Sequence, residues 1–212
     1  MRSVDHYVYE GTKVLINKFD CRDEEKLREI EALSTAGNLA YLQLHPIQGK
    51  FDFAHLKEIH RFIFQDLYDW AGQTRNIDIG KNNLFCRAQF IEEYAASVFS
   101  DFYTSCMESR EDPAAFVKTL AKHYADMNAL HPFREGNGRS QREFTRELCL
   151  TCGYVFDLTR TGQSEMLEAS IESFNTGNYD KFIEIFSYTV IPVAEYDHLE
   201  ENLDRILMIF AK

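Results

Sequence analysis

The residues from His131 to Arg142, with the sequence HPFREGNGRSQR, bring together an imidazole, a carboxylate, two arginines and two glycines that flank an asparagine. Glycines at the start of a helix let successive backbone N–H groups point into one concavity, where the helix dipole favours an anion. We therefore expect Gly136, Asn137 and Gly138 to form a turn that binds phosphate. A Gly-x-Gly sequence alone also occurs in ordinary turns.

Two arginines strengthen this interpretation. Arg139 and Arg142 are three residues apart, so they project from one side of the first turns of the predicted helix. A cation at a helix N-terminus is unfavourable by roughly 0.3–1 kcal/mol, so two of them are better explained by a multiply charged anion between them. Arginine also binds phosphate oxygens through two N–H groups at once. Two solvated surface arginines are the alternative.

An acid and a base flank the turn. A carboxylate next to phosphate needs a cation between them, and Mg²⁺ is typically held by one or two carboxylates together with substrate phosphates. We therefore predict that Glu135 is a metal ligand, the alternative being an exposed glutamate that favours the helix dipole. His131 follows a helix, and Pro132 and Phe133 fix its loop. Since imidazole is the commonest general base near neutral pH, we predict that His131 accepts a proton from an attacking hydroxyl.

The other histidines and the cysteines are expected to have no part in the chemistry. The remaining histidines, interpreted as structural or solvated, are His6, His45, His55, His60, His123 and His198. Cys149 and Cys152 form a lone CxxC. No second pair completes a zinc site, so two reduced cysteines near a helix end are favoured.

Composition limits the class of protein. A chain of 212 residues with 45% hydrophobic and 27% charged residues is typical of one soluble globular domain. The net charge of −11 argues against a nucleic-acid partner. The sequence contains no run of 18 apolar residues and no apolar segment at its start, so we expect a cytoplasmic protein without a membrane partner.

Helical periodicity dominates the chain. The predicted helices are 24–44 (with a potential break at Gly37), 53–67, 89 to about 107, 114–130, 136 or 138 to 152, 163–174, 179–191 and 195–210. Asp52 and Asp112 occupy N-cap positions, and Pro113 follows the second of them. Between residues 75 and 86, alternating Ile77 and Ile79 precede a polar turn, which predicts a β-hairpin. The expected fold is all-α with one small hairpin.

The twelve residues resemble the Fic motif, H-P-F-x-[D/E]-G-N-G-R-x-x-R, at each specified position. Upstream, residues 49–60 and 68–75 look like the corresponding family segment. The resemblance covers roughly residues 50–190 of a single domain, 1–212. A helical segment, 1–49, precedes this core, and a C-terminal helix, 193–212, follows it.

The resemblance implies a Fic-type helical bundle with a β-hairpin flap, and it implies protein adenylylation. Fic proteins transfer AMP from ATP to a Ser, Thr or Tyr hydroxyl of a target protein and release pyrophosphate. The implied roles are His131 as base, Phe133 as structural anchor, Glu135 as Mg²⁺ ligand, Gly136, Asn137 and Gly138 as anion hole, and Arg139 and Arg142 as ligands of the β- and γ-phosphates. The implied flap, which aligns a target segment by main-chain pairing, includes Asp78, Asn82, Asn83, Leu84 and Phe85.

Other reactions stay open. Doc-type relatives replace the second motif glycine with a bulkier residue and act as kinases, so an intact Gly138 favours AMP transfer. Transfer of another nucleotide is an alternative, since the motif does not select adenine. A binding module without chemistry is the non-enzymatic alternative, and an intact His131 counts against it.

Control of the activity is the last question the sequence raises. Many Fic proteins carry an inhibitory helix, [S/T]-x-x-x-E-[G/N], whose glutamate pairs with the second motif arginine. No complete copy is present, and the segment Asp197 to Asn202 has Glu201 but lacks the hydroxyl residue. We favour a separate small antitoxin that supplies the glutamate over self-restraint through Glu201. A toxin, a secreted effector and a regulator all fit the sequence.

Overall fold

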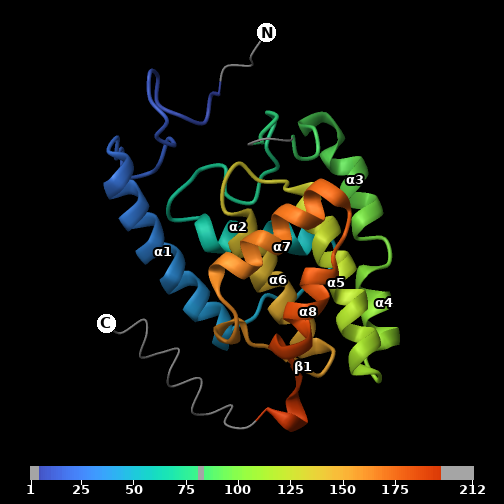
Figure 1. Cartoon of the computed structure of the whole chain (residues 1–212). Helices are drawn as coiled ribbons and strands as arrows, with labels where there is room; N and C mark the ends of the chain where they lie inside the picture. Colours follow the sequence, from blue (N-terminus) through green and yellow to red (C-terminus); the bar gives the residue numbers. More distant parts are fainter. Residues whose placement is uncertain (1–4, 81–83, 197–212) are drawn as a thin grey trace.

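The computed structural model of the chain describes residues 5–80 and 84–196 (Figure 1). It is mostly helical, so the all-α class is confirmed. The α-helices are α1 (Glu24–Leu44), α2 (Phe53–Phe64), α3 (Ile91–Val98), α4 (Phe102–Ser109), α5 (Pro113–Leu130), α6 (Asn137–Thr151), α7 (Gln163–Thr176) and α8 (Asp180–Thr189). Short 3-10 helices span Ala88–Phe90, Leu158–Arg160 and Val193–Glu195. Two short strands, β1 (Tyr154–Phe156) and β2 (Val190–Pro192), pair antiparallel.

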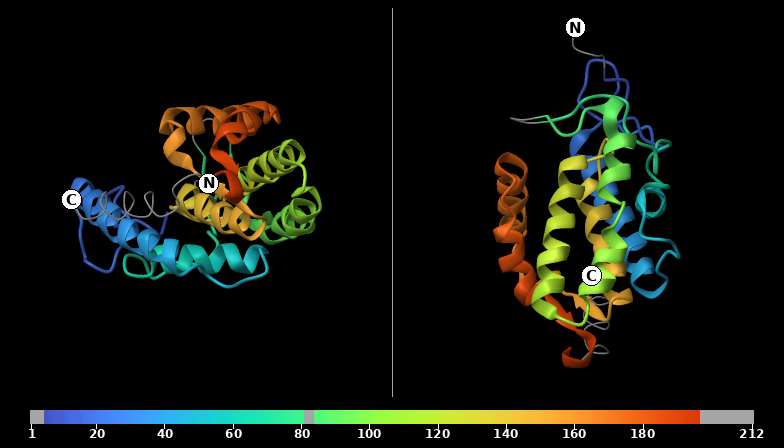
Figure 2. Two further views of the ribbon diagram at one scale, coloured as in Figure 1. Left: turned by 90° about the horizontal axis from the view of Figure 1, so that it is seen from below. Right: turned by 90° about the vertical axis from the view of Figure 1, so that its right-hand side faces the viewer.

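The helices lie in layers with α5 and α6 in the middle (Figure 2). On one side α2 packs against α6 and α1 packs against α2, while on the other side α7 and α8 pack against α5. The helices α3 and α4 flank α5. The core between these layers is rich in aromatic rings, and its fully buried members include Phe102, Phe116, Phe144, Phe182 and Phe186. The middle helix pair therefore carries the motif inside a rigid, closely packed frame.

Aspartates start the helices where the sequence predicts. The Asp52 carboxylate accepts a hydrogen bond from the N–H of His55 (2.9 Å). Asp112 accepts from the N–H groups of Ala114 (3.0 Å) and Ala115 (3.2 Å). Each carboxylate satisfies backbone donors that the first turn leaves unpaired. Both predicted caps are confirmed, and Gly37 does not interrupt α1.

The prediction of one helix from residue 89 to 107 is wrong. The chain forms α3 and α4, which are separated between Val98 and Phe102. There the Ser100 hydroxyl donates to the carbonyl of Ser97 (2.8 Å), and Asp101 accepts from the Ser105 hydroxyl (3.2 Å). Short polar side chains compete with the helical backbone in this way, and apolar periodicity does not reveal the break.

The predicted helices 53–67 and 179–191 are both too long. The first of them, α2, ends at Phe64. The second, α8, ends at Thr189, and the next residues form β2, in which Val190 pairs with Phe156 of β1. β-branched residues directly before a proline favour an extended backbone, which explains the change from helix to strand. No pattern in the sequence predicted this sheet.

The predicted hairpin between residues 75 and 86, called the flap below, is present in minimal form. Gly80 and Leu84 form an isolated antiparallel bridge, and the N–H of Phe85 donates to the carbonyl of Ile79 (3.2 Å). The Asp78 carboxylate accepts from the N–H of Ala88 (2.7 Å) and thereby fixes the stem. Two of the predicted flap residues, Asn82 and Asn83, lie outside the described residues, as does the predicted helix beyond Tyr196.

Among residues 5–80 and 84–196, none of the helices has the length and apolar character that a membrane span needs.

Candidate functional site

The motif occupies a helix-loop-helix between α5 and α6. His131 ends α5 with φ 44° and ψ 59°, and Gly136 precedes α6 with φ 83°. A left-handed conformation costs a residue other than glycine roughly 1–2 kcal/mol, so surrounding contacts must hold His131 in place. The first N–H groups of α6 follow directly after Gly136, as an anion-binding turn requires.

Side chains within the motif brace the loop. The Asn137 amide oxygen accepts from the N–H of Phe133 (2.8 Å), and its amide nitrogen donates to the carbonyl of the same residue (2.8 Å). The Phe133 ring is fully buried and stacks on the His60 ring at 3.8 Å. Because the Asn137 side chain is occupied in this way, it is the backbone of Asn137 that is free to contribute to an anion hole.

His60 of α2 supports the same loop from below. Its Nδ1 accepts from the N–H of Gly72 (2.8 Å), and its Nε2 donates to the carbonyl of Glu135 (3.0 Å). Burial lowers the pKa of His60 to about 3. The hydrogen bond to the Glu135 carbonyl opposes this shift, and the nearby positive charge of Arg139 adds to it. The ring is therefore neutral with a fixed tautomer. The sequence offered one signal for this contact, a histidine on the otherwise apolar face of a predicted helix.

The two motif glycines differ in their surroundings. A Cβ atom at Gly136 would lie 2.2 Å from the ring of Phe64, so this position requires glycine on two grounds, space and positive φ. A Cβ atom at Gly138 would lie 3.0 Å from Nη1 of Arg142, the mobile end of a long side chain. The Arg142 guanidinium thus lies directly over Gly138, and a larger residue there would displace it.

The two motif arginines have different partners. Arg139 donates to Glu31 (2.5 Å) and Thr35 (3.2 Å) of α1, and its guanidinium lies over the Phe64 ring at 4.7 Å. Arg142 is exposed and forms no hydrogen bond or ion pair with any residue in the described ranges. Arg142 is therefore the arginine with a guanidinium free for phosphate, whereas α1 holds Arg139. Sequence reasoning missed Glu31, which has no distinctive signal on a helix rich in glutamate.

Glu135 is suited to a metal bound together with phosphate. Its carboxylate accepts from the N–H of Gly136 (2.9 Å), lies 3.5 Å from Arg139, and belongs to a side chain that is 46% exposed. Among the described residues there is no group of three or more His, Cys, Asp or Glu side chains arranged to hold a metal. A single accessible carboxylate fits Mg²⁺, which keeps several waters and takes phosphate oxygens.

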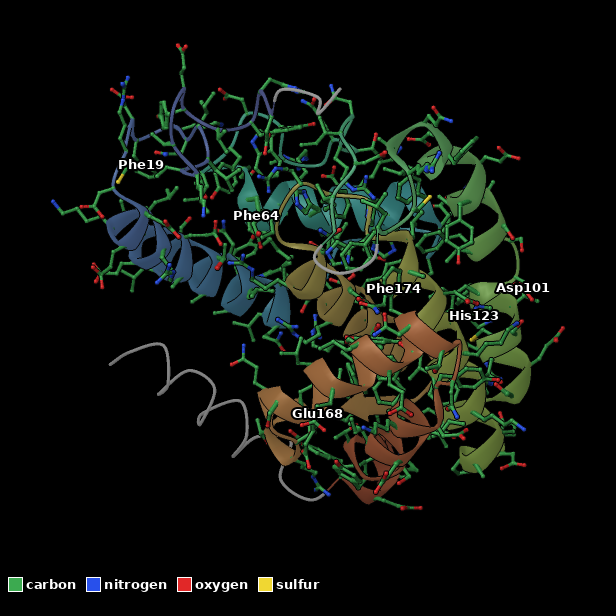
Figure 3. The ribbon with its side chains drawn as sticks, turned by 45° about the horizontal axis from the view of Figure 1, so that its top comes forward. Phe19, Phe64, Asp101, His123, Glu168 and Phe174 are labelled. Atoms are coloured by element: carbon green, nitrogen blue, oxygen red, sulfur yellow. The ribbon has the colours of Figure 1, made fainter. Side chains whose placement is uncertain are left out.

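His131 lies under the flap. Its imidazole stacks on the ring of Phe85 at 3.7 Å with an interplanar angle of 6°. Phe174 of α7, which is labelled in Figure 3, also packs against the Phe85 ring, with the ring centroids 4.7 Å apart. Burial lowers the pKa of His131 to about 4; the hydrogen bond with the backbone of Asn128 opposes this shift and the charge of Arg75 adds to it. The imidazole is therefore neutral at physiological pH.

The fold brings most of the predicted site residues into one region. Phe85 of the flap lies against His131, and the same loop leads through Gly136 into the α6 N-terminus. Glu201, the predicted inhibitory residue, lies outside the described residues. Sequence reasoning also missed Arg75, which is only 2% exposed and donates to the carbonyl of His131 (2.9 Å). Its place at the end of a polar loop gave no sign that it is buried.

This loop between two central helices, with its flap, defines a Fic-type site. A sequence model described as Fic/DOC family matches residues 50–149, and relatives named as adenylyltransferases match more of the chain. The chain belongs to the Fic/DOC family.

Among the relatives, "Probable protein adenylyltransferase y4lH" of Sinorhizobium fredii is 39% identical over 173 residues, which cover 81% of this chain and 88% of that protein. "Protein adenylyltransferase VbhT" of Bartonella schoenbuchensis is 38% identical over 179 residues, or 84% of this chain. The match covers only 37% of VbhT, so this chain corresponds to a part of that protein.

Solved structures agree with the fold. The BepC effector of Bartonella tribocorum with bound AMPPNP has a TM-score of 0.81 at 25% identity, over 88% of this chain and 96% of that one. The Fic domain of a VirB-translocated Bep effector of Bartonella quintana with bound ADP also has a TM-score of 0.81, at 27% identity over 88% and 94% of the two chains. Both of those structures thus hold an adenine nucleotide or an analogue of one.

Proposed function

We propose that this chain is a protein adenylyltransferase, which transfers AMP from ATP to a Ser, Thr or Tyr hydroxyl of a target protein. The observation that carries the proposal is a neutral, flap-covered His131 beside a helix N-terminus at which the Arg142 guanidinium is free. The adenylyltransferase names of relatives at 35–39% identity support the same reaction.

The chemistry follows from these positions. The neutral imidazole of His131 accepts the proton of the target hydroxyl. The hydroxyl oxygen forms a bond to the α-phosphorus of ATP while the bond from that phosphorus to the bridging oxygen breaks, and pyrophosphate leaves. Backbone N–H groups at the start of α6 stabilise the charge that develops on the phosphate oxygens. Such a reaction depends on orientation and charge neutralisation more than on covalent help from the protein.

Cations complete the site for a triphosphate. Arg142 binds the terminal phosphates, and Arg139 does so to the extent that Glu31 releases it. Glu135 would hold Mg²⁺, which when bound neutralises the charge of the α- and β-phosphates. The flap edge around Gly80 and Leu84, of which Leu84 is 56% exposed, would pair with an extended segment of the target.

Transfer of AMP is favoured over transfer of the γ-phosphate. The Arg142 guanidinium lies over the small Gly138, and a bulkier residue at that position would push it away from the anion-binding turn. A cytoplasmic location stays a prediction, with delivery as a secreted effector as its alternative.

Restraint by a separate antitoxin is the favoured mode of control. An exposed Arg142 without an ion pair among the described residues offers a site for an incoming carboxylate. Self-restraint through Glu201 is the second possibility. If it operates, Glu201→Gly will raise self-AMPylation several-fold in a labelled-ATP assay, whereas unchanged labelling supports control by a partner.

The reaction class can be tested with labelled ATP. The purified chain is incubated with Mg²⁺, a bacterial lysate and ATP labelled at either the α- or the γ-phosphate. We expect protein-bound label from the α position only, and none with His131→Ala. Label from the γ position would instead show a kinase, and an absence of label with ATP alongside transfer from UTP or GTP would show another nucleotidyltransferase.

A further inference from the structure

A buried arginine links the flap to the catalytic loop. Arg75 is 2% exposed, and its guanidinium donates to three backbone carbonyls: those of Ile77 (2.8 Å), Cys86 (2.5 Å) and His131 (2.9 Å). The carbonyls of Ile77 and Cys86 belong to the two stems of the flap. The third carbonyl belongs to His131, the predicted catalytic base. Its backbone N–H also donates to the carbonyl of Pro132 (2.9 Å).

The geometry of arginine suits this task. A guanidinium has five N–H donors in a rigid plane, so one side chain can hold three chain segments in a fixed relation. No carboxylate in the described part of the chain forms an ion pair with Arg75, and burial lowers its pKa. Burying such a charge is costly, so its three carbonyl partners must offset a penalty that an apolar side chain would avoid.

The carbonyl of His131 is the informative partner. This residue has a left-handed backbone, which is strained for a side chain other than glycine. The bond from Nε of Arg75 stabilises that conformation, which in turn aims the imidazole. The imidazole also stacks on the ring of Phe85. Phe85 directly precedes Cys86, whose carbonyl accepts a hydrogen bond from Arg75.

We propose that Arg75 is a positioning residue for AMP transfer, which holds the two flap stems and the His131 backbone as one unit. A target segment that pairs with the flap is thereby placed in a fixed relation to the base. The proposal rests on the adenylyltransferase function proposed above. It assigns no contact between Arg75 and the nucleotide, so it separates the placement of the acceptor from the binding of ATP.

The test compares Arg75→Lys and Arg75→Met with wild type. Lysine keeps the charge but cannot span three carbonyls, so both variants should lose the linkage. Arg160→Lys is the matched control, because Arg160 is 52% exposed and pairs with Asp157 away from the motif. Folding of each variant is checked by far-UV circular dichroism.

Two readouts do not depend on activity. Amide exchange of Cys86, whose N–H donates to the carbonyl of Ala129 (3.2 Å), should become at least tenfold faster in both Arg75 variants. The NMR signal of the His131 imidazole, which is assigned with His131→Ala, should lose the ring-current shift that stacking on Phe85 causes. Neither readout should change in the Arg160 control.

Kinetics provide the third readout. Self-AMPylation from α-labelled ATP should fall roughly 10–100-fold in kcat, while the KM for ATP and the affinity for AMPPNP stay within about twofold. A variant with wild-type rates, exchange and NMR signal would overturn the proposal. So would a failure of both variants to fold, which would make Arg75 purely structural.

Failure of the two proposals can be told apart. A wild-type chain that takes no label from the α position argues against AMP transfer, whatever the Arg75 variants do. In that case amide exchange and the NMR signal still decide whether Arg75 couples the flap to His131.

Discussion

In the proposed reaction, the two residues His131 and Arg142 have separable tasks. His131 is neutral and covered by the flap, whereas Arg142 is exposed over the anion-binding turn. The first residue can act on a proton, and the second can act only as a fixed positive charge. Mutations at the two positions should therefore affect different steps.

His131→Ala should abolish AMP transfer and leave ATP binding nearly unchanged, since it removes the base but none of the phosphate ligands. Arg142→Ala should weaken binding of the triphosphate by roughly 1.5–3 kcal/mol, the usual contribution of a hydrogen bond to a charged group. Calorimetry with AMPPNP and transfer of α-label measure the two effects. Equal loss of binding in both variants would show that His131 is structural.

The pH dependence of the reaction depends on the same imidazole. With a pKa of about 4, His131 is in its base form throughout the neutral range and loses that form only in acid. We expect kcat/KM to be constant from about pH 8 to 5 and to fall as the pH passes through the pKa, since this parameter reports the free enzyme. Binding of AMPPNP at each pH separates protonation of the nucleotide from that of the base. A midpoint near 6.5 would contradict the burial seen here.

At the scale of elements, the loop between α5 and α6 is held by its neighbours. Asn137 closes it from within, and His60 and Phe64 of α2 support it from below. These side chains thus fix the backbone of the predicted anion-binding turn before any ligand arrives, which is the preorganisation that charge stabilisation requires.

Gly136→Ala tests the closeness of this packing. The new Cβ would meet Phe64 at 2.2 Å in a left-handed backbone, which adds overpacking of roughly 1–3 kcal/mol to strain of roughly 1–2 kcal/mol. Gly177→Ala is the matched control, since Gly177 has φ 72° and a Cβ there would meet nothing within 4 Å. Urea denaturation should show the larger loss for position 136. Equal losses would mean that Phe64 moves aside freely.

At the scale of the whole molecule, segments outside the family-matched residues 50–149 reach the site. Glu31 of α1 binds Arg139, and Asp5 binds Arg134 at 2.7 Å. On the opposite side, Phe174 of α7 covers Phe85. The surroundings of the site therefore include segments from Asp5 to Phe174.

Acid should weaken this assembly through His60. Its pKa is about 3 in the folded chain against an ordinary 6.5, so the unfolded chain binds the proton first. The stabilising contribution is complete above pH 6.5 and declines as the pH falls towards 3, by about 1.4 kcal/mol per pH unit. Urea denaturation at pH 7, 6 and 5 should give a flatter slope for His60→Gln than for wild type. His45→Gln, at the exposed end of α1, is the control, and equal slopes for all three would refute the assignment.

Local spacing was enough to predict most of the helices, their aspartate caps and the identity of the motif. Capping requires only neighbours in the chain, and the motif is contiguous. The helix ends at Val98 and Thr189 were not predicted, because competing side-chain hydrogen bonds and strand pairing override the apolar periodicity there.

The surroundings of the motif depend on contacts between segments far apart in the chain. Glu31 meets Arg139 across 108 positions of the chain, and Arg75 meets the carbonyl of His131 across 56. Such contacts depend on how helices pack, and no local pattern encodes them. Two arginines with the same sequence signature consequently differ, Arg139 being held by α1 while Arg142 is free of ion pairs among the described residues. The residue types indicated the chemistry, whereas packing between distant segments of the chain positions the side chains that would carry it out.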